Sequence, residues 1–269
     1  MRHRLSIYQI SALSVALASL LIAVIRVIVL KENIETTGDT KSFYYILNNT
    51  ETVVSLVFIG CFALAFICVA FVIGKKANSF IPFDSSPVVF SSSLCGFMFL
   101  ATGLYYSYQF FTDHSVSGAK FAIALSMAFA SAMFLDLALL KEGKKRKSIT
   151  YLRFIVCGYS ILRLVLDFIE QNRHPANSAV SFHILSLIAF MLFIVYEGKL
   201  EFSPGSMRAY LISGYLCVLF MLVYAVPNLL ITLMDITIDP YILFSAVDIS
   251  IAFFVFTRTF SVCYTKPKN

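Results

Sequence analysis

The chain has 269 residues, of which 59% are hydrophobic and only 13% are charged, and its mean hydropathy is +0.84. A soluble domain carries about 25% charged residues, so this composition excludes a water-soluble protein and indicates an integral membrane protein. The formal net charge of +6 does not indicate nucleic-acid binding, because the basic residues lie in short connections between apolar runs.

Eight apolar runs in the sequence are long enough to cross a membrane as helices, which takes about 20 residues at a rise of 1.5 Å each. The connections between them are too short to fold as domains of their own. The sequence therefore predicts an all-α, polytopic membrane protein with eight transmembrane helices. The predicted spans are 6–30, 52–73, 87–110, 119–140, 150–170, 179–197, 209–232 and 240–262.

The basic residues are distributed unevenly between the two sides of these spans. Thirteen lysines and arginines lie in the connections and termini on one side, five of them in the segment 141–147, and three lie on the other side. Cytoplasmic connections carry the excess of lysine and arginine in membrane proteins. We therefore expect both termini and the segment 141–147 in the cytoplasm.

The two halves of the chain, 1–148 and 149–269, contain similar segments in the same order. AVIRVIVLKENIE at the end of the first span resembles SILRLVLDFIEQN at the end of the fifth, which places Arg26 on Arg163. Both spans run outward, so the two halves have the same orientation in the membrane. The sequence therefore predicts a parallel internal repeat of four helices plus four, related by an axis along the membrane normal.

Three charged residues, Arg163, Asp167 and Glu170, lie on one face of the fifth span at the spacing i, i+4, i+7. Arg163 is about 10 Å inside the outer surface, from the rise of 1.5 Å per residue. An arginine that faces lipid at the helix centre costs about 2.5–3.5 kcal/mol on insertion scales. We expect this face to point into the bundle, with Asp167 one turn away as the partner of Arg163 and Asp248 of the eighth span as a candidate third partner.

Other ionisable residues are predicted at a similar depth on other spans, and such groups avoid lipid by converging. We predict that they form a polar, ligand-binding cleft that opens outward between the two halves. For Arg26 three interpretations stay open: it extends to the outer surface, pairs with Asp167 or Asp248 of another helix, or binds an anionic ligand. His183 is predicted to be a hydrogen-bonded packing residue in preference to a proton carrier. The predicted site residues are Arg26, Arg163, Asp167, His183 and Asp248.

Further small or polar residues have structural interpretations. Ala124, Ala128 and Ala132 recur every four residues in the fourth span and predict a close helix contact. Pro227 and Asn228 are expected to interrupt the seventh span. Near the inner ends of the spans, four charged residues are expected to mark the cytoplasmic interface: Asp136, Arg153, Glu197 and Arg258.

No catalytic or metal-binding motif is found in the sequence, which contains no HExxH, no GxSxG, no phosphate-binding glycine loop and no EF-hand. The six cysteines lie in apolar runs without paired spacing, which indicates buried thiols. We therefore expect no catalytic residues, no metal and no cofactor.

The segments RVIVLKENIETTGDTKSF, LRLVLDFIEQN and LSLIAFMLFIVYEGKLEF resemble segments of multi-span membrane proteins of anaerobic, low-GC Gram-positive bacteria. The similarity covers most of the chain. It implies a multi-pass protein of a bacterial plasma membrane. No activity is established for that family, so the resemblance implies nothing about chemistry.

Three functional classes fit this interpretation. The first is a carrier, or the substrate-binding membrane component of one, that uses the polar site for a small solute or an anion. The second is a non-catalytic partner or assembly subunit of another membrane protein, in which buried ion pairs only fix the helix register. The third is a small membrane enzyme. We favour the first, because ionisable groups at a repeat interface suit transport; lipids are expected partners in every class and nucleic acid in none.

Overall fold

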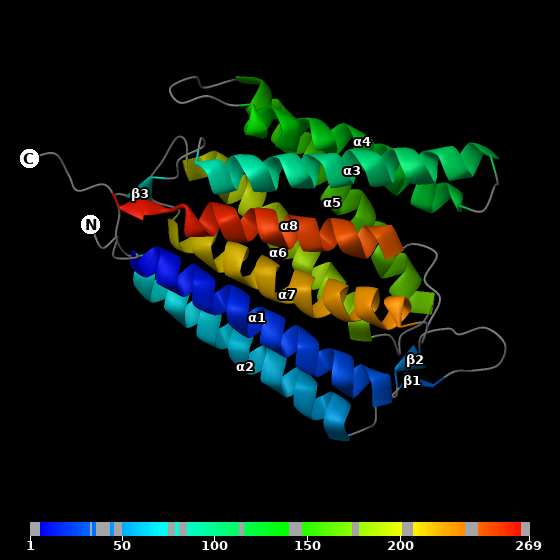
Figure 1. The fold of residues 1–269 in the computed structure, drawn as a ribbon, viewed down its shortest axis with the longest axis horizontal. Coiled ribbons are helices and arrows are strands. Elements are labelled where there is room, and N and C mark those ends of the chain that lie inside the picture. Colours follow the sequence, from blue (N-terminus) through cyan, green and yellow to red (C-terminus); the bar gives the residue numbers. More distant parts are fainter. Residues whose placement is uncertain are drawn as a thin grey trace, which may run out of the picture.

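The structure, a computed structural model, describes residues 6–32, 34–35, 44–45, 50–74, 79–80, 85–112, 116–139, 147–173, 178–200, 207–234 and 242–264. Within these ranges the chain forms eight helices and four two-residue strands (Figure 1). The helices are α1 (Ile7–Glu32), α2 (Thr50–Ile73), α3 (Ser86–Thr112), α4 (Gly118–Ala138), α5 (Lys147–Arg173), α6 (Ser178–Leu200), α7 (Met207–Leu233) and α8 (Ile242–Phe260). The strands are β1 (Ile34–Glu35), β2 (Tyr44–Tyr45), β3 (Ser79–Phe80) and β4 (Cys263–Tyr264).

Seven of the eight helices are long and apolar enough to cross a membrane, which supports the prediction of a multi-pass helical membrane protein. The helix outside this group is α5, which has 27 residues, as many as α7, but is less apolar because it carries Arg153, Arg163 and Asp167. Because α5 packs against both α4 and α6, it lies within the bundle. Its crossing of the membrane as the eighth span stays a prediction.

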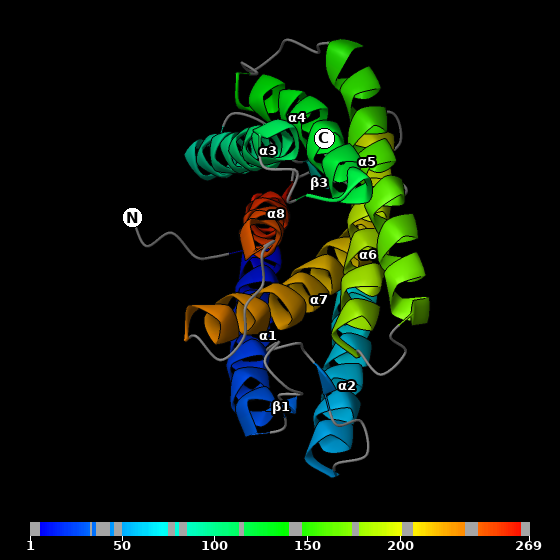
Figure 2. The ribbon, with the colours of Figure 1, turned by 90° about the vertical axis from the view of Figure 1, so that its right-hand side faces the viewer.

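The helices form a bundle with α7 and α8 at its centre (Figures 1 and 2). Helices α1 and α2 both pack on α7. On the opposite side of the bundle, α3 packs on α8 and also on α4. Helix α5 contacts both α4 and α6. Strand β1 pairs with β2, and β3 pairs with β4, at opposite ends of the bundle in Figure 1. Because β3 precedes α3 and β4 follows α8, the start of α3 and the end of α8 lie at one end.

The outward surface of the bundle is apolar, as expected for a surface in contact with lipid. Large apolar side chains are exposed along α1 and α2, including Leu17, Leu21, Leu64 and Val72. A soluble protein rarely exposes such continuous apolar surface. The exposed side chains therefore support the membrane assignment independently of helix length.

Helix α7 differs from the prediction at Pro227. The helix continues from Met207 to Leu233 with Pro227 inside it, so the predicted interruption at Pro227 and Asn228 is wrong. Pro227 is buried. Transmembrane helices tolerate an internal proline where neighbouring helices and local adjustments compensate for the backbone group that loses its partner.

The small residues of α4 form a close contact with α3, as predicted. A Cβ atom built on Gly103 of α3 would lie 2.6 Å from the carbonyl oxygen of Ala124 and 2.9 Å from the backbone nitrogen of Ala128. Such separations are shorter than a van der Waals contact, so the two backbones meet where neither residue has a bulky side chain. Glycine at position 103 is therefore required by the approach of α4.

The packing order does not establish the predicted internal repeat. Some pairs correspond, since α1 packs on α2 as α5 packs on α6, and α3 packs on α4 as α7 packs on α8. Helix α6 also packs extensively on α7, whereas the corresponding α2 has its main contacts with α7 and α1. The repeat, and with it the division into 1–148 and 149–269, stays a prediction.

Candidate functional site

Four of the five predicted site residues meet in one buried cluster, which we call the outer network after the side of the membrane predicted for it: Arg163, Asp167, His183 and Asp248. Helix α5 contributes the first two, α6 contributes His183 and α8 contributes Asp248. Each lies in the half of its helix nearer to the β1–β2 end of the bundle. Charged groups on three separate helices therefore converge at one depth, as the cost of exposing them to lipid requires.

Arg163 and Asp248 form the central ion pair of the outer network. Arg163 Nη1 donates to Asp248 Oδ1 at 2.6 Å, and Nη2 donates to Oδ2 at 2.8 Å. Two parallel charge-assisted hydrogen bonds of this kind are the strongest geometry between arginine and a carboxylate. The predicted pair of Arg163 with Asp167 is wrong, because the planar guanidinium fits the carboxylate on α8.

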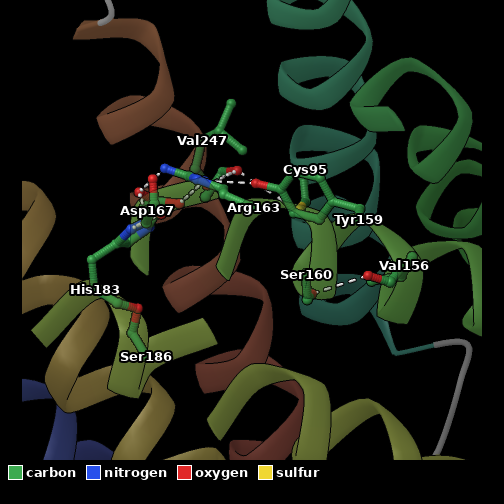
Figure 3. A network of polar contacts seen from close by, with 11 residues as sticks. Cys95, Val156, Tyr159, Ser160, Arg163, Asp167, His183, Ser186 and Val247 are labelled. Carbon is green, nitrogen blue, oxygen red and sulfur yellow. Dashed lines mark hydrogen bonds and ion pairs between the residues drawn. The ribbon is translucent and has the colours of Figure 1, made fainter. Parts of the chain in front are cut away.

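Asp167 instead contacts His183. Its Oδ2 lies 2.7 Å from His183 Nδ1, and the opposite ring nitrogen, Nε2, lies 3.3 Å from Asp248 Oδ2. The imidazole thus stands between carboxylates of two other helices. Figure 3 shows the side of the ring that faces Asp167. Only the imidazolium form has a proton on both nitrogens and can interact favourably with both carboxylates, whereas the neutral ring carries a single N–H group.

Aromatic rings enclose the outer network. The ring of Tyr224 from α7 stacks on His183 at a centroid distance of 4.3 Å. The hydroxyl of Tyr159 accepts a hydrogen bond of 2.6 Å from Arg163 Nη1, and the Phe244 ring lies 5.4 Å from Arg163 Cζ. Stacking and cation–π contacts of this kind hold ionised groups away from lipid without adding charge.

Tyr224 and Phe244 were not predicted as parts of the site. The sequence contains no signal for Tyr224, because α7 is apolar on all sides and its periodicity does not show which face meets α6. Phe244 lies one turn before Asp248 on α8, so its position beside the ion pair follows from helix geometry once Asp248 is placed.

The outer network is closed in this conformation. The exposed fraction is 0% for Asp248 and no more than 8% for the other three residues. With His183 protonated, two positive and two negative groups balance, whereas a neutral His183 leaves one net negative charge. The predicted outward cleft is therefore not open at these residues.

Arg26, the fifth predicted site residue, contacts an aromatic ring next to the network. It is buried, and its Cζ stands 4.4 Å from the centre of the Phe182 ring. Phe182 immediately precedes His183 on α6, so Arg26 approaches the network from α1 through an aromatic ring. The side chain of Glu170 lies outside the described residues.

A second buried ion pair lies toward the β3–β4 end of the bundle. Arg258 Nε of α8 donates to Glu197 Oε1 of α6 at 2.5 Å, and both side chains are buried. Arg153 of α5 is also buried, whereas the prediction placed all three of these residues at the membrane interface. The sequence could not show this, because residues near helix ends reach either the interface or a neighbouring helix.

In the described part of the chain, no group of three or more His, Cys, Asp and Glu side chains could hold a metal ion. Comparison with protein families, with curated proteins and with solved structures finds no match to this chain. The resemblance to membrane proteins of Gram-positive bacteria therefore stays a prediction. The function has to be argued from the geometry of the outer network and its membrane setting.

Proposed function

We propose that this chain is an integral membrane carrier, or the substrate-binding membrane subunit of one, whose outer network binds and releases a proton. The observation that supports the proposal is the position of His183, buried between Asp167 and Asp248 of two other helices. Ionisable groups inside a membrane bundle are costly, and proteins keep them for ion pathways and proton relays. A purely structural contact does not need a side chain that can gain or lose a proton, as an imidazole can.

The charge of the outer network favours a cation over an anion as the transported species. Loss of the proton from His183 leaves two carboxylates against one guanidinium. A cation that enters the site restores the balance, so proton and cation compete for the same negative charge. Transport requires a second, open conformation of the protein. In that conformation a cleft toward the β1–β2 end lets the solute reach the network.

The experiment uses proteoliposomes with an acidic interior, an internal pH dye and an external panel of Na⁺, K⁺ and small organic amines. We expect at least one cation to raise the internal pH by exchange with protons, and His183→Gln to abolish the response. Arg208→Gln is the matched control, because Arg208 stacks on Phe71 outside the network. Wild-type vesicles that respond to no cation, or a response that survives in His183→Gln, would overturn the proposal.

A non-catalytic membrane partner or assembly subunit is the second candidate. The closure of the outer network favours this candidate. A buried and balanced set of ion pairs can have a structural role alone, which is to fix the register of α5, α6 and α8. The two candidates differ in the vesicle experiment, because an assembly subunit exchanges no protons.

An enzyme is the third candidate, and the described residues offer little for it. Ser186 is one turn from His183, but its hydroxyl donates to the His183 backbone carbonyl at 2.6 Å. That hydroxyl is not activated by the imidazole, as a nucleophilic serine requires.

We further propose that α5 crosses the membrane and that both termini are cytoplasmic, in a bacterial plasma membrane. The support is the excess of lysine and arginine in the connections at the β3–β4 end. A single cysteine introduced at Thr37, in a background without the natural cysteines, should react with an impermeant maleimide on intact cells. One introduced at Lys144 should react only after the cells are opened. The reverse pattern would contradict the orientation.

A further inference from the structure

Two ion pairs join α6 to α8 at different depths of the bundle. Toward the β1–β2 end, His183 Nε2 of α6 lies 3.3 Å from Asp248 Oδ2 of α8. Toward the β3–β4 end, Arg258 Nε of α8 donates to Glu197 Oε1 of α6 at 2.5 Å, and we call this contact the inner pair. At a rise of 1.5 Å per residue, the two contacts are about 15–21 Å apart along the helices.

An aromatic layer separates the inner pair from the outer network. Phe193 precedes Glu197 by one turn on α6, and Phe254 precedes Arg258 by one turn on α8. The rings of Phe193 and Phe254 meet edge to face with their centroids 6.5 Å apart. The ring of Tyr210 from α7 stacks on Phe193 at a centroid distance of 4.8 Å, and all three aromatic side chains are fully buried. Hydrophobic constrictions of this kind exclude water and close membrane pathways.

The closed inner pair leaves part of Glu197 unsatisfied. Oε1 of Glu197 accepts from Arg258, whereas Oε2 is buried and accepts no hydrogen bond from any residue that the structure describes. In the outer network, by contrast, both oxygens of Asp248 accept from Arg163. A buried charged oxygen without a partner is costly, and water removes this cost when it reaches the carboxylate. The inner pair is therefore better suited than the outer one to a contact that opens.

The inner pair and the aromatic layer close the β3–β4 end of the bundle in this conformation. We propose that together they form a gate, which opens when α8 moves against α6 and separates Arg258 from Glu197. Phe193 and Phe254 then part, and water reaches the outer network from the β3–β4 end. The inference rests on the proposed carrier function, because a carrier that exposes its site alternately needs a closure on each side of that site.

Cys217 of α7 is a natural reporter for the state of this gate. It is fully buried and lies one turn from Gly214, on the face of α7 that also carries Tyr210. A Cβ atom built on Gly214 would lie 3.2 Å from Phe193 Cδ2 and 2.7 Å from Thr259 Cγ2, so this face meets α6 and α8 at the aromatic layer. Cys217 therefore lies between the aromatic layer and the depth of the outer network.

The test measures how fast a charged, membrane-impermeant methanethiosulfonate modifies Cys217 when the other five cysteines are replaced by alanine. Membrane vesicles of both orientations are used, and a separate protein with its only cysteine at position 144 shows which vesicles present the β3–β4 end outward. We expect Glu197→Gln to raise the rate from that end at least tenfold, which corresponds to about 1.4 kcal/mol of lost closure, and to leave the rate from the other end unchanged. Arg258→Gln breaks the same pair from α8 and should have the same effect.

Two controls separate the gate from a general loosening of the fold. Exchange of the two charges, Glu197→Arg with Arg258→Glu, restores the attraction and should return the rate to the wild-type value. Arg208→Gln removes a cation at the start of α7, outside the inner pair, and should leave the rate unchanged.

Three results would overturn the gate: an unchanged rate in both single variants, a rate raised equally from both ends, or an exchanged-charge variant as fast as Glu197→Gln. The labelling needs no transported cation. Failure of the carrier proposal is a different result, namely the absence of cation exchange in wild-type proteoliposomes.

Discussion

Asp248→Ala is expected to destabilise the folded protein by about 3–5 kcal/mol, which is the typical effect of removing one partner from a buried ion pair. The reason is that the variant removes a carboxylate but keeps the positive charge of Arg163. Arg163 is buried and directs two hydrogen bonds to Asp248, so the variant leaves its guanidinium without its main counter-charge. The measurement is SDS-induced unfolding in mixed micelles.

The double variant Arg163→Met with Asp248→Leu provides the matching comparison. Replacing both members of a buried pair by apolar residues is often neutral or stabilising. We therefore expect the double variant to be more stable than Asp248→Ala, although His183 and Asp167 remain. If the double variant is the less stable of the two, the outer network depends more on its other contacts than on this pair. The surface variant Arg208→Gln should change stability by less than about 1 kcal/mol.

The sequence predicted the setting of the outer network better than its pairing. The cost of ionised groups in lipid is enough to predict that Arg163, Asp167, His183 and Asp248 face inward at one depth. It does not decide which carboxylate Arg163 contacts. A spacing of i, i+4 places Asp167 near Arg163, but the side chain that completes a planar, two-bond contact comes from α8.

The same limit applies to the helix order. Helices that are apolar on all sides show where they begin and end, because length and hydropathy determine the spans. Their periodicity carries little information about which face meets which neighbour. That is why eight helices could be predicted, whereas the contact of Tyr224 with His183 and the buried pair of Arg258 with Glu197 could not.

The close contact of α3 with α4 also affects the outer network, through aromatic residues of α3. On α3, Phe99 lies one turn before Gly103 and contacts the ring of Tyr159 at a centroid distance of 5.1 Å. Tyr106 lies one turn after Gly103 and contacts Phe244 at 4.8 Å. Both partner rings touch Arg163, so the position of α3 affects the aromatic wall of the site.

Gly103→Ala is therefore expected to destabilise the protein by about 1–3 kcal/mol, as overpacking of a filled core does. The new methyl group would meet backbone atoms of Ala124 and Ala128, which cannot rotate away, so α3 and α4 have to separate. The control is Gly158→Ala on α5, where a Cβ atom meets nothing within 4 Å. An alanine at that helical position should stabilise by about 0.5–1 kcal/mol, because glycine loses more backbone entropy on folding. Equal unfolding midpoints for the two variants in SDS would contradict the contact between α3 and α4.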